Sequence, residues 1–257
     1  MLENLGYFEY AIIAIAAVGS AVIKNGVGVG AGIFMLPFLS LVLPAKSALG
    51  LGAPIMLISE IAGVVYYWKE WNKRELLLLL PPAIIGIILG VAMIKAIPNE
   101  QFRFFVGFPA ILFSSYQLLK LKLLKPKSSG RWANWIPTPK KTLAVLFGFL
   151  GGVASSVIHA GGLAMSPYLI LKSSDKREFV GTFVLFFAII NLLKVIAYLR
   201  IEILTSEIVL LAAIMSPIII LGSFLGNVLN KCVSQIAFRV IVLAVILIIG
   251  VSLLIKT

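Results

Sequence analysis

The sequence KNGVGVGAGIFMLPFL, from Lys24 to Leu39, carries a glycine at every second position between Gly26 and Gly32 and a proline at position 37. Each glycine costs a helix roughly 1 kcal/mol relative to alanine, so four in seven residues predict a break. Apolar residues flank this stretch, and unwound backbone in such a setting has to be buried in protein or line a cavity. Helix packing alone favours glycines four residues apart and explains a two-residue alternation badly.

A second stretch, GGVASSVIHAGGLAMSPYL from Gly151 to Leu169, follows the same plan. GAGIFMLPFL aligns with HAGGLAMSPYL, so that Pro37 stands opposite Pro167. Ordered matches of this kind indicate an old internal duplication. Further matches follow at a slowly drifting offset: Gly50 with Gly181, Gly86 and Gly90 with Gly222 and Gly226, and Phe102-Arg103 with Phe238-Arg239.

The composition places both repeats in a membrane. Of the 257 residues, 61% are hydrophobic and 12% are charged, which leaves too little polar surface for a soluble globule. Apolar segments of about 20 residues, the length that crosses a bilayer, recur along the whole chain. The first, Tyr10 to Ile23, follows Glu3 and Glu9 instead of a basic region, so it does not resemble a cleavable signal peptide.

Each repeat is predicted to begin with a broken, re-entrant hairpin and to continue with three transmembrane helices. Residues 1–123 form the first repeat, residues 124–140 a basic linker with prolines, and residues 141–257 the second repeat. The fold class is therefore all-α and polytopic, with two inverted repeats. The predicted segments are the hairpin 7–43 and the spans 47–68, 76–97 and 102–119, then the hairpin 142–171 and the spans 179–199, 208–229 and 236–255.

Basic residues orient this arrangement. If both hairpins enter and return on the same side, most Lys and Arg residues outside the spans fall on the side of the linker. The positive-inside rule then predicts a multi-pass protein of the plasma membrane with a cytoplasmic linker and both termini outside. Because three crossings follow each hairpin, the second repeat must be inverted relative to the first, as in alternating-access carriers.

The two breaks predict a binding site where they meet. Half-helices that start near Ile33 and Leu163 would point free N–H groups and the positive end of the helix dipole at the breaks, which favours anions. The residues expected to bind the substrate come from both breaks and from the span after the second: Lys24, Asn25, Gly26, Gly28, Gly30, Gly32, Ser155, Ser156, His159, Ala160, Gly161, Gly162, Asn191 and Lys194.

Four ionisable residues fall within the predicted spans: Lys24, Glu60, His159 and Lys194. A charge at this depth costs about 3 kcal/mol, so each invites a functional interpretation. Lys24 either supplies positive charge to an anion or snorkels to an interface. His159 either supplies charge too or satisfies unwound backbone as a neutral imidazole.

Glu60 is the repeat partner of Asn191, and both should face the same central region. Glu60 is therefore a candidate for proton coupling; the alternative is a structural ion pair with Lys194 or Lys24. Lys194 lies one helical turn beyond Asn191 and should share its face.

Other chemistries find little support. One cysteine and one histidine predict no metal site, and no cofactor is expected. The net charge of +12 comes mainly from short loops between spans, where topology explains it, so nucleic-acid binding is not expected. The expected partners are lipid, a small anion and a coupling proton, and the sequence is compatible with a homodimer.

The two glycine-rich breaks, GVGVGAGIFMLP and HAGGLAMSP, resemble the repeated motif of the sulfite exporter TauE/SafE (TSUP) family of anion permeases, as do Gly50, Gly181-Thr182 and the Phe-Arg pairs. The resemblance covers nearly the whole chain. It implies a carrier of sulfur-containing anions such as sulfite, thiosulfate or organosulfonates, with proton coupling as one option. The chain departs from the family pattern at His159-Ala160, Leu51 and Lys24-Asn25, which leaves the particular anion open.

A secondary active transporter is thus the predicted function, and an enzyme is not expected. An uncoupled anion channel is one alternative, because it could use the same half-helix ends; it would give large currents without exchange. A membrane-embedded enzyme or assembly factor is the second. An enzyme would need a His-Glu metal cluster or a nucleophile with a nearby base, and the sequence offers neither.

Overall fold

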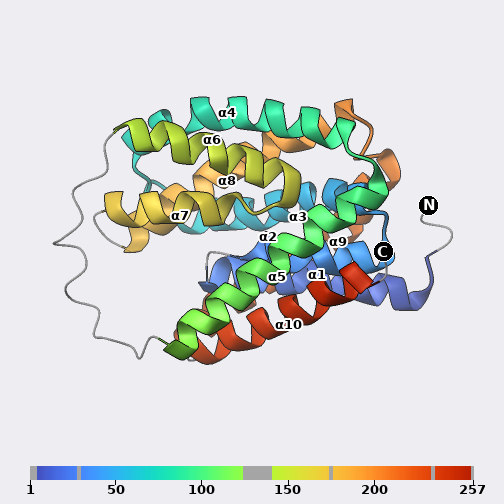
Figure 1. Cartoon of the computed structure of the whole chain (residues 1–257). Helices are drawn as coiled ribbons and strands as arrows, with labels where there is room; N and C mark the ends of the chain where they lie inside the picture. The colour runs from blue at the N-terminus through green and yellow to red at the C-terminus, as the bar shows by residue number, and fades with distance from the viewer. Residues whose placement is uncertain (1–4, 28–29, 124–140, 174–175, 233–234, 256–257) are drawn as a thin grey trace.

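The computed structural model describes residues 5–27, 30–123, 141–173, 176–232 and 235–255. In these ranges the chain is a bundle of helices without a strand (Figure 1). Six of the described helices, α1, α3, α4, α6, α8 and α9, are long and apolar enough to cross a membrane. The predicted fold class, an all-α polytopic membrane protein, is confirmed. The helices are α1 (Tyr7–Val27), α2 (Ala31–Val42), α3 (Ala45–Tyr66), α4 (Lys73–Ala96), α5 (Asn99–Leu123), α6 (Lys141–Ile158), α7 (Gly161–Lys172), α8 (Lys176–Arg200), α9 (Ser206–Cys232) and α10 (Gln235–Ile255).

Helices α2 and α7 are half-helices. Each has 12 residues, and at 1.5 Å per residue this gives about 18 Å, too short for a hydrocarbon core of about 30 Å. The backbone is left-handed just before each of them, with φ of 99° at Gly30 and 54° at His159. His159 directly follows the last residue of α6, and Gly30 directly precedes α2; a left-handed residue at such a position lets the chain turn back.

The breaks are shorter than the sequence predicted. Helix α1 continues through Gly26, and α6 continues through the glycines and serines at 151–156. The helices persist because their glycines serve close packing. A Cβ on Gly152 would overlap the carbonyl oxygen of Ala83 in α4, and a Cβ on Gly26 would lie 3.3 Å from the carbonyl oxygen of Gly226 in α9.

The two hairpins enter from opposite ends of the molecule. Helix α1 begins at the end where α10 finishes, and α2 turns back toward it; α6 begins at the other end, where α5 finishes, and α7 turns back toward that end (Figure 1). The tips of the hairpins touch. A Cβ on Gly32 would overlap the carbonyl oxygen of His159 and lie 2.5 Å from the His159 Cβ. Glycine at position 32 is what permits this close approach.

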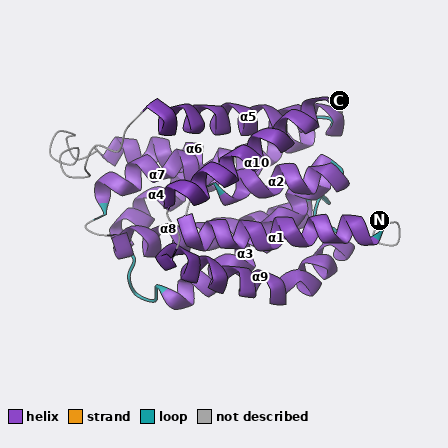
Figure 2. Cartoon of the chain, turned by 90° about the horizontal axis from the view of Figure 1, so that it is seen from below, coloured by secondary structure: helices purple, strands orange, loops and turns teal. Residues whose placement is uncertain are grey.

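The long helices pack in pairs that cross between the halves. Helix α4 packs on α6, α1 on α9, α3 on α8 and α5 on α10 (Figure 2). The pairing is symmetric between the halves. If each helix of α1–α5 is exchanged with its counterpart in α6–α10 (α1 with α6, α4 with α9), the α4–α6 pair becomes the α9–α1 pair. The α3–α8 and α5–α10 pairs stay the same. The glycines predicted to allow close packing lie in the first two pairs: a Cβ on Gly90 would overlap Ser156 Oγ, and one on Gly226 would lie 2.6 Å from the Val22 carbonyl oxygen.

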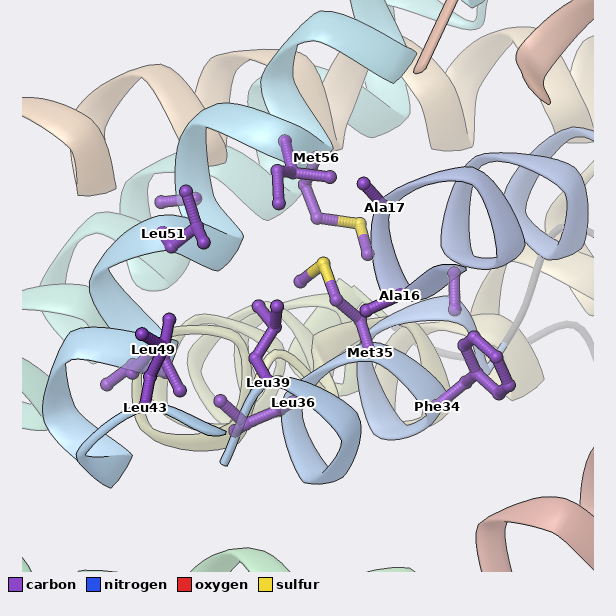
Figure 3. Packing of buried hydrophobic residues seen from close by; sticks show 14 of the residues in the cluster. Ala16, Ala17, Phe34, Met35, Leu36, Leu39, Leu43, Leu49, Leu51 and Met56 are labelled. Atoms are coloured by element: carbon purple, nitrogen blue, oxygen red, sulfur yellow. The ribbon is translucent and has the colours of Figure 1, made fainter. Parts of the chain in front are cut away.

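An apolar core holds α2 against α1 and α3. Ala16 and Ala17 of α1 leave space for Met35 of α2 and Met56 of α3, whose side chains lie next to each other (Figure 3). Met35 is fully buried and Met56 is 4% exposed. Methionine is unbranched and adapts to irregular gaps between helices. This packing fixes the first turn of α2, and with it the N–H groups at the break.

Candidate functional site

A small cavity lies where the hairpin tips meet. Its walls come from both tips and from α1, α3 and α8. Its volume is about 30 Å³, space for a group of roughly two or three water-sized atoms. The fold therefore offers room for a compact ligand at the point where both breaks contribute backbone.

Two helix N-termini border this cavity. Gly30, Ala31 and Gly32 line it at the start of α2, and Ala160 and Gly162 line it at the start of α7. Neither N-cap residue, Gly30 or Ala160, gives its helix a side-chain hydrogen bond. The first N–H groups of a helix have no partner within the helix and carry the positive end of its dipole. Both half-helices thus present amide donors of the kind that bind anions.

Lys194 of α8 lies next to the cavity, with its side chain fully buried. Its Nζ is 2.6 Å from His159 Nδ1 and 2.9 Å from Asn191 Oδ1. Ser155 Oγ is the third acceptor, at 3.3 Å. An ammonium has three N–H donors, so these three acceptors satisfy it completely. The bond to Ser155 is the longest and is the one that a ligand oxygen could replace most easily.

Asn191 connects Lys194 to Glu60. Its Nδ2 donates to Glu60 Oε2 at 2.7 Å, while its Oδ1 accepts from Lys194. Glu60 is 1% exposed, and its Oε1 lies 2.5 Å from Lys24 Nζ. Two predictions are thereby confirmed: Glu60 and Asn191 face the same region, and Lys194 shares the face of Asn191. Of the two lysines considered as partners for Glu60, Lys24 forms the ion pair.

His159 uses both ring nitrogens inside the protein. Its Nε2 lies 3.0 Å from the carbonyl oxygen of Leu49 in α3. A carbonyl only accepts, so Nε2 carries the proton and Nδ1 is the acceptor for the ammonium of Lys194. This arrangement favours the interpretation of His159 as a neutral imidazole that satisfies backbone. The positive charge near the cavity then comes from the lysines.

Lys24 is the lysine that lines the cavity. Within the described residues it makes one hydrogen bond, to Glu60. Its remaining contacts are with the ring faces of Phe187 and Phe183, whose centroids lie 4.7 and 5.3 Å from Nζ. A ring face attracts a cation without using up an N–H donor. As far as the described residues are concerned, two donors of Lys24 therefore remain for a ligand.

Phe183 and Phe187 also line the cavity, and sequence reasoning missed them. Apolar residues in an apolar span carry no polar signal. The available signals were their four-residue spacing and the position of Phe183 immediately after Gly181-Thr182.

The predicted substrate residues divide into three groups. Gly28 lies outside the described residues. Asn25 donates to Ser59 Oγ at 3.1 Å, and Ser156 donates to the carbonyl oxygen of Gly152 at 2.9 Å. These two belong to a group that bonds or packs beside the cavity and also contains Gly26, Gly161 and Lys194. The cavity itself is lined by Lys24, Gly30, Gly32, Ser155, His159, Ala160, Gly162 and Asn191.

The charged cluster, formed by Lys24, Glu60, His159, Asn191 and Lys194, has formal charges that do not cancel. With both lysines protonated, Lys24 and Lys194 contribute two positive charges, ionised Glu60 contributes one negative charge, and His159 is neutral in the hydrogen-bonding pattern described above. An excess positive charge in a buried site is costly until a counter-charge arrives. The described residues contain no group of three or more His, Cys, Asp or Glu side chains that could hold a metal ion. The cluster is therefore suited to an anion of low charge.

Comparison with known proteins gives one match. The model of the family described as sulfite exporter TauE/SafE matches residues 12–253. No curated protein and no solved structure matches the chain. The matched range contains the second hairpin, the first hairpin from residue 12 onward, and every residue of the charged cluster. The chain therefore belongs to the sulfite exporter TauE/SafE family.

Proposed function

We propose that the protein is a secondary active transporter that carries a small sulfur-containing anion, such as sulfite, thiosulfate or an organosulfonate, across the plasma membrane. The family description supports the class of substrate. The observation that carries the proposal is the convergence, on one small cavity, of two uncapped helix N-termini and a charge cluster with one excess positive charge.

The anion would bind with its oxygens toward three sets of donors. The first-turn N–H groups of α2 and α7 supply the first two sets. The two donors of Lys24 not used by Glu60 supply the third. Ser155 lines the cavity and accepts a hydrogen bond from Lys194. An anion oxygen that accepts a hydrogen bond from the Ser155 hydroxyl is thereby linked to the buried ammonium. Hydrogen bonds between charged groups and amides are stronger than neutral ones, which suits selective binding of an anion.

Charge balance supports a proton-coupling role for Glu60. A bound monoanion cancels the excess charge of the cluster, whereas a dianion leaves one negative charge in a buried site. Protonation of Glu60 would then restore neutrality, and it would also release Lys24 to the substrate. One proton would move with each dianion.

Inverted repeats and alternating access are supported by the arrangement of the helices. The hairpins open toward opposite ends, and the pair α4–α6 exchanges with α1–α9 when the halves are exchanged. The beginning of α1 and the end of α10 share one end of the molecule, as expected for two external termini (Figures 1 and 2). A cytoplasmic linker, the plasma membrane and a homodimer stay predictions.

Purified protein in proteoliposomes should exchange labelled sulfite against internal unlabelled sulfite, and the rate should saturate with concentration. A carrier must bind its substrate at each turnover, which limits its flux, whereas a channel conducts without exchange. Liposomes without protein provide the background. Large uncoupled anion currents would favour the channel alternative, and no flux or binding for any of the three anion classes would refute the proposed function.

The Glu60→Gln variant should keep sulfite exchange but lose uptake driven by a proton gradient. Gln has nearly the size of Glu and cannot take up or release the coupling proton. The measurement compares exchange at equal pH with accumulation under an imposed pH gradient. Glu207→Gln, on the first turn of α9 and away from the cavity, is the matched control. Acid-driven accumulation that survives in Glu60→Gln would exclude Glu60 as the coupling group.

A further inference from the structure

Two phenylalanines form one wall of the cavity. Phe183 and Phe187 lie one turn apart on α8, each is 3% exposed, and their ring centroids are 4.7 Å apart. Both line the cavity together with Lys24. Neither ring can donate a strong hydrogen bond, so the two phenylalanines do not bind the oxygens of an anion.

The two rings lie between the Lys24 ammonium and the first turn of α7. On one side they contact the Lys24 ammonium through their faces. On the other side a Cβ on Gly162 would lie 2.9 Å from Phe183 Cζ, and a Cβ on Gly161 would lie 3.0 Å from Phe187 Cε1. The glycines at the start of α7 thus bring the rings up against the backbone. Both rings are therefore packed on two sides, against the Lys24 ammonium and against the first turn of α7.

This wall limits the size of the anion that the amide donors and Lys24 can bind. An anion held by the amide donors and by Lys24 has its oxygens turned toward those donors, because ring faces carry negative partial charge and repel oxygen. Any substituent that is not an oxygen is then directed at the apolar part of the lining, to which the two rings belong together with Ile33, Met56 and Leu163. The space for a water-sized group is only about 30 Å³, and the two rings bound it on this side, so a carbon chain directed at them has to displace a ring.

We infer that Phe183 and Phe187 are specificity-determining residues that restrict the site to compact oxyanions and reject sulfonates with a carbon chain. The inference rests on the proposed function and narrows its substrate class to inorganic sulfur oxyanions. A single methylene that a pocket cannot accommodate changes binding by roughly 10- to 200-fold. The same rings hold Lys24 in place, so removing one should also weaken the binding of sulfite somewhat.

The test uses the purified full-length chain in detergent and isothermal titration with sulfite and with ethanesulfonate. The native protein should bind sulfite at least about tenfold more tightly than ethanesulfonate. Phe183→Ala and Phe187→Ala should each bind ethanesulfonate at least about tenfold more tightly than the native protein does. Phe179→Ala is the matched control, because Phe179 lies one turn earlier on α8, contacts Phe183 and does not line the cavity.

A gain for ethanesulfonate separates size selection from a mere effect on Lys24, which would weaken both anions together. If the alanine variants do not fold, Phe183→Leu and Phe187→Leu decide the question with a smaller but still measurable gain. Native protein that prefers ethanesulfonate, or ring variants without any gain while sulfite still binds to the native protein, would overturn the inference. Native protein that binds neither of these anions, and does not bind thiosulfate in the same titration, would overturn the proposed function and the inference with it.

Discussion

Replacing Lys24 by methionine should lower the free energy of unfolding by about 3–5 kcal/mol, the usual cost of removing one partner of a buried ion pair. Methionine keeps most of the length of the side chain and removes only the ammonium. Glu60 is 1% exposed, and Lys24 Nζ lies 2.5 Å from its Oε1, so the carboxylate would lose its charged partner. The measurement is the midpoint of thermal or SDS-induced unfolding of purified protein.

The same variant should lose anion binding by at least about 100-fold. Each hydrogen bond from a charged donor contributes roughly 1.5–3 kcal/mol, and Lys24 has two donors available for the ligand. Removing its charge also leaves one positive charge, on Lys194, and one negative charge, on Glu60. The cluster at the cavity then no longer carries an excess positive charge. Isothermal titration with sulfite measures the loss. Lys95→Met is the control, because Lys95 is an exposed lysine in the last turn of α4.

A double variant separates the two effects of Lys24. Lys24→Met combined with Glu60→Gln removes both members of the ion pair, so most of the lost stability should return. It also restores one excess positive charge, carried by Lys194, and sulfite binding should therefore recover in part. Native-like affinity in the single variant would remove Lys24 from the site. Stability that does not recover in the double variant would show that the ion pair is not the cause of the loss.

The sequence predicted the place of both breaks but not their length. Alternating glycines identify backbone that can leave the helix, and Gly30 with its φ of 99° is such a residue. Gly26 and Gly152 have the same composition signal and stay helical, because α9 and α4 need their missing side chains for close approach. Whether a glycine serves conformation or packing depends on the neighbouring helix, which the sequence of one span does not contain.

The charged cluster was predictable within one helix and unpredictable between helices. The three-residue spacing of Asn191 and Lys194 places them on one face, and their hydrogen bond of 2.9 Å follows from that spacing. The repeat register correctly brought Glu60 to Asn191. The choice of Lys24 over Lys194 as the ion-pair partner of Glu60 depends on how α1, α3 and α8 meet, and the repeat register does not fix this.

Replacing Gly32 by alanine should separate the two hairpin tips and abolish sulfite binding. The added Cβ would overlap the carbonyl oxygen of His159 and lie 2.5 Å from its Cβ, and both atoms belong to the tip of the other hairpin. Overpacking of this kind costs about 1–3 kcal/mol or more. A separation of about 1 Å takes the amide donors of α2 beyond the 2.7–3.2 Å range in which they bond to a shared ligand.

Gly151→Ala is the matched control for this prediction. Gly151 also lies near a break, but the atoms nearest to its added Cβ would be at 3.7 and 3.8 Å, which is ordinary contact. Because alanine favours a helix interior, this variant should bind sulfite normally and unfold at an equal or slightly higher temperature. Equal effects of the two substitutions on sulfite binding would contradict the role of the Gly32–His159 contact. Normal sulfite binding by Gly32→Ala would mean that the two breaks do not form one site, because the amide donors of α2 and α7 can share a ligand only while the tips touch.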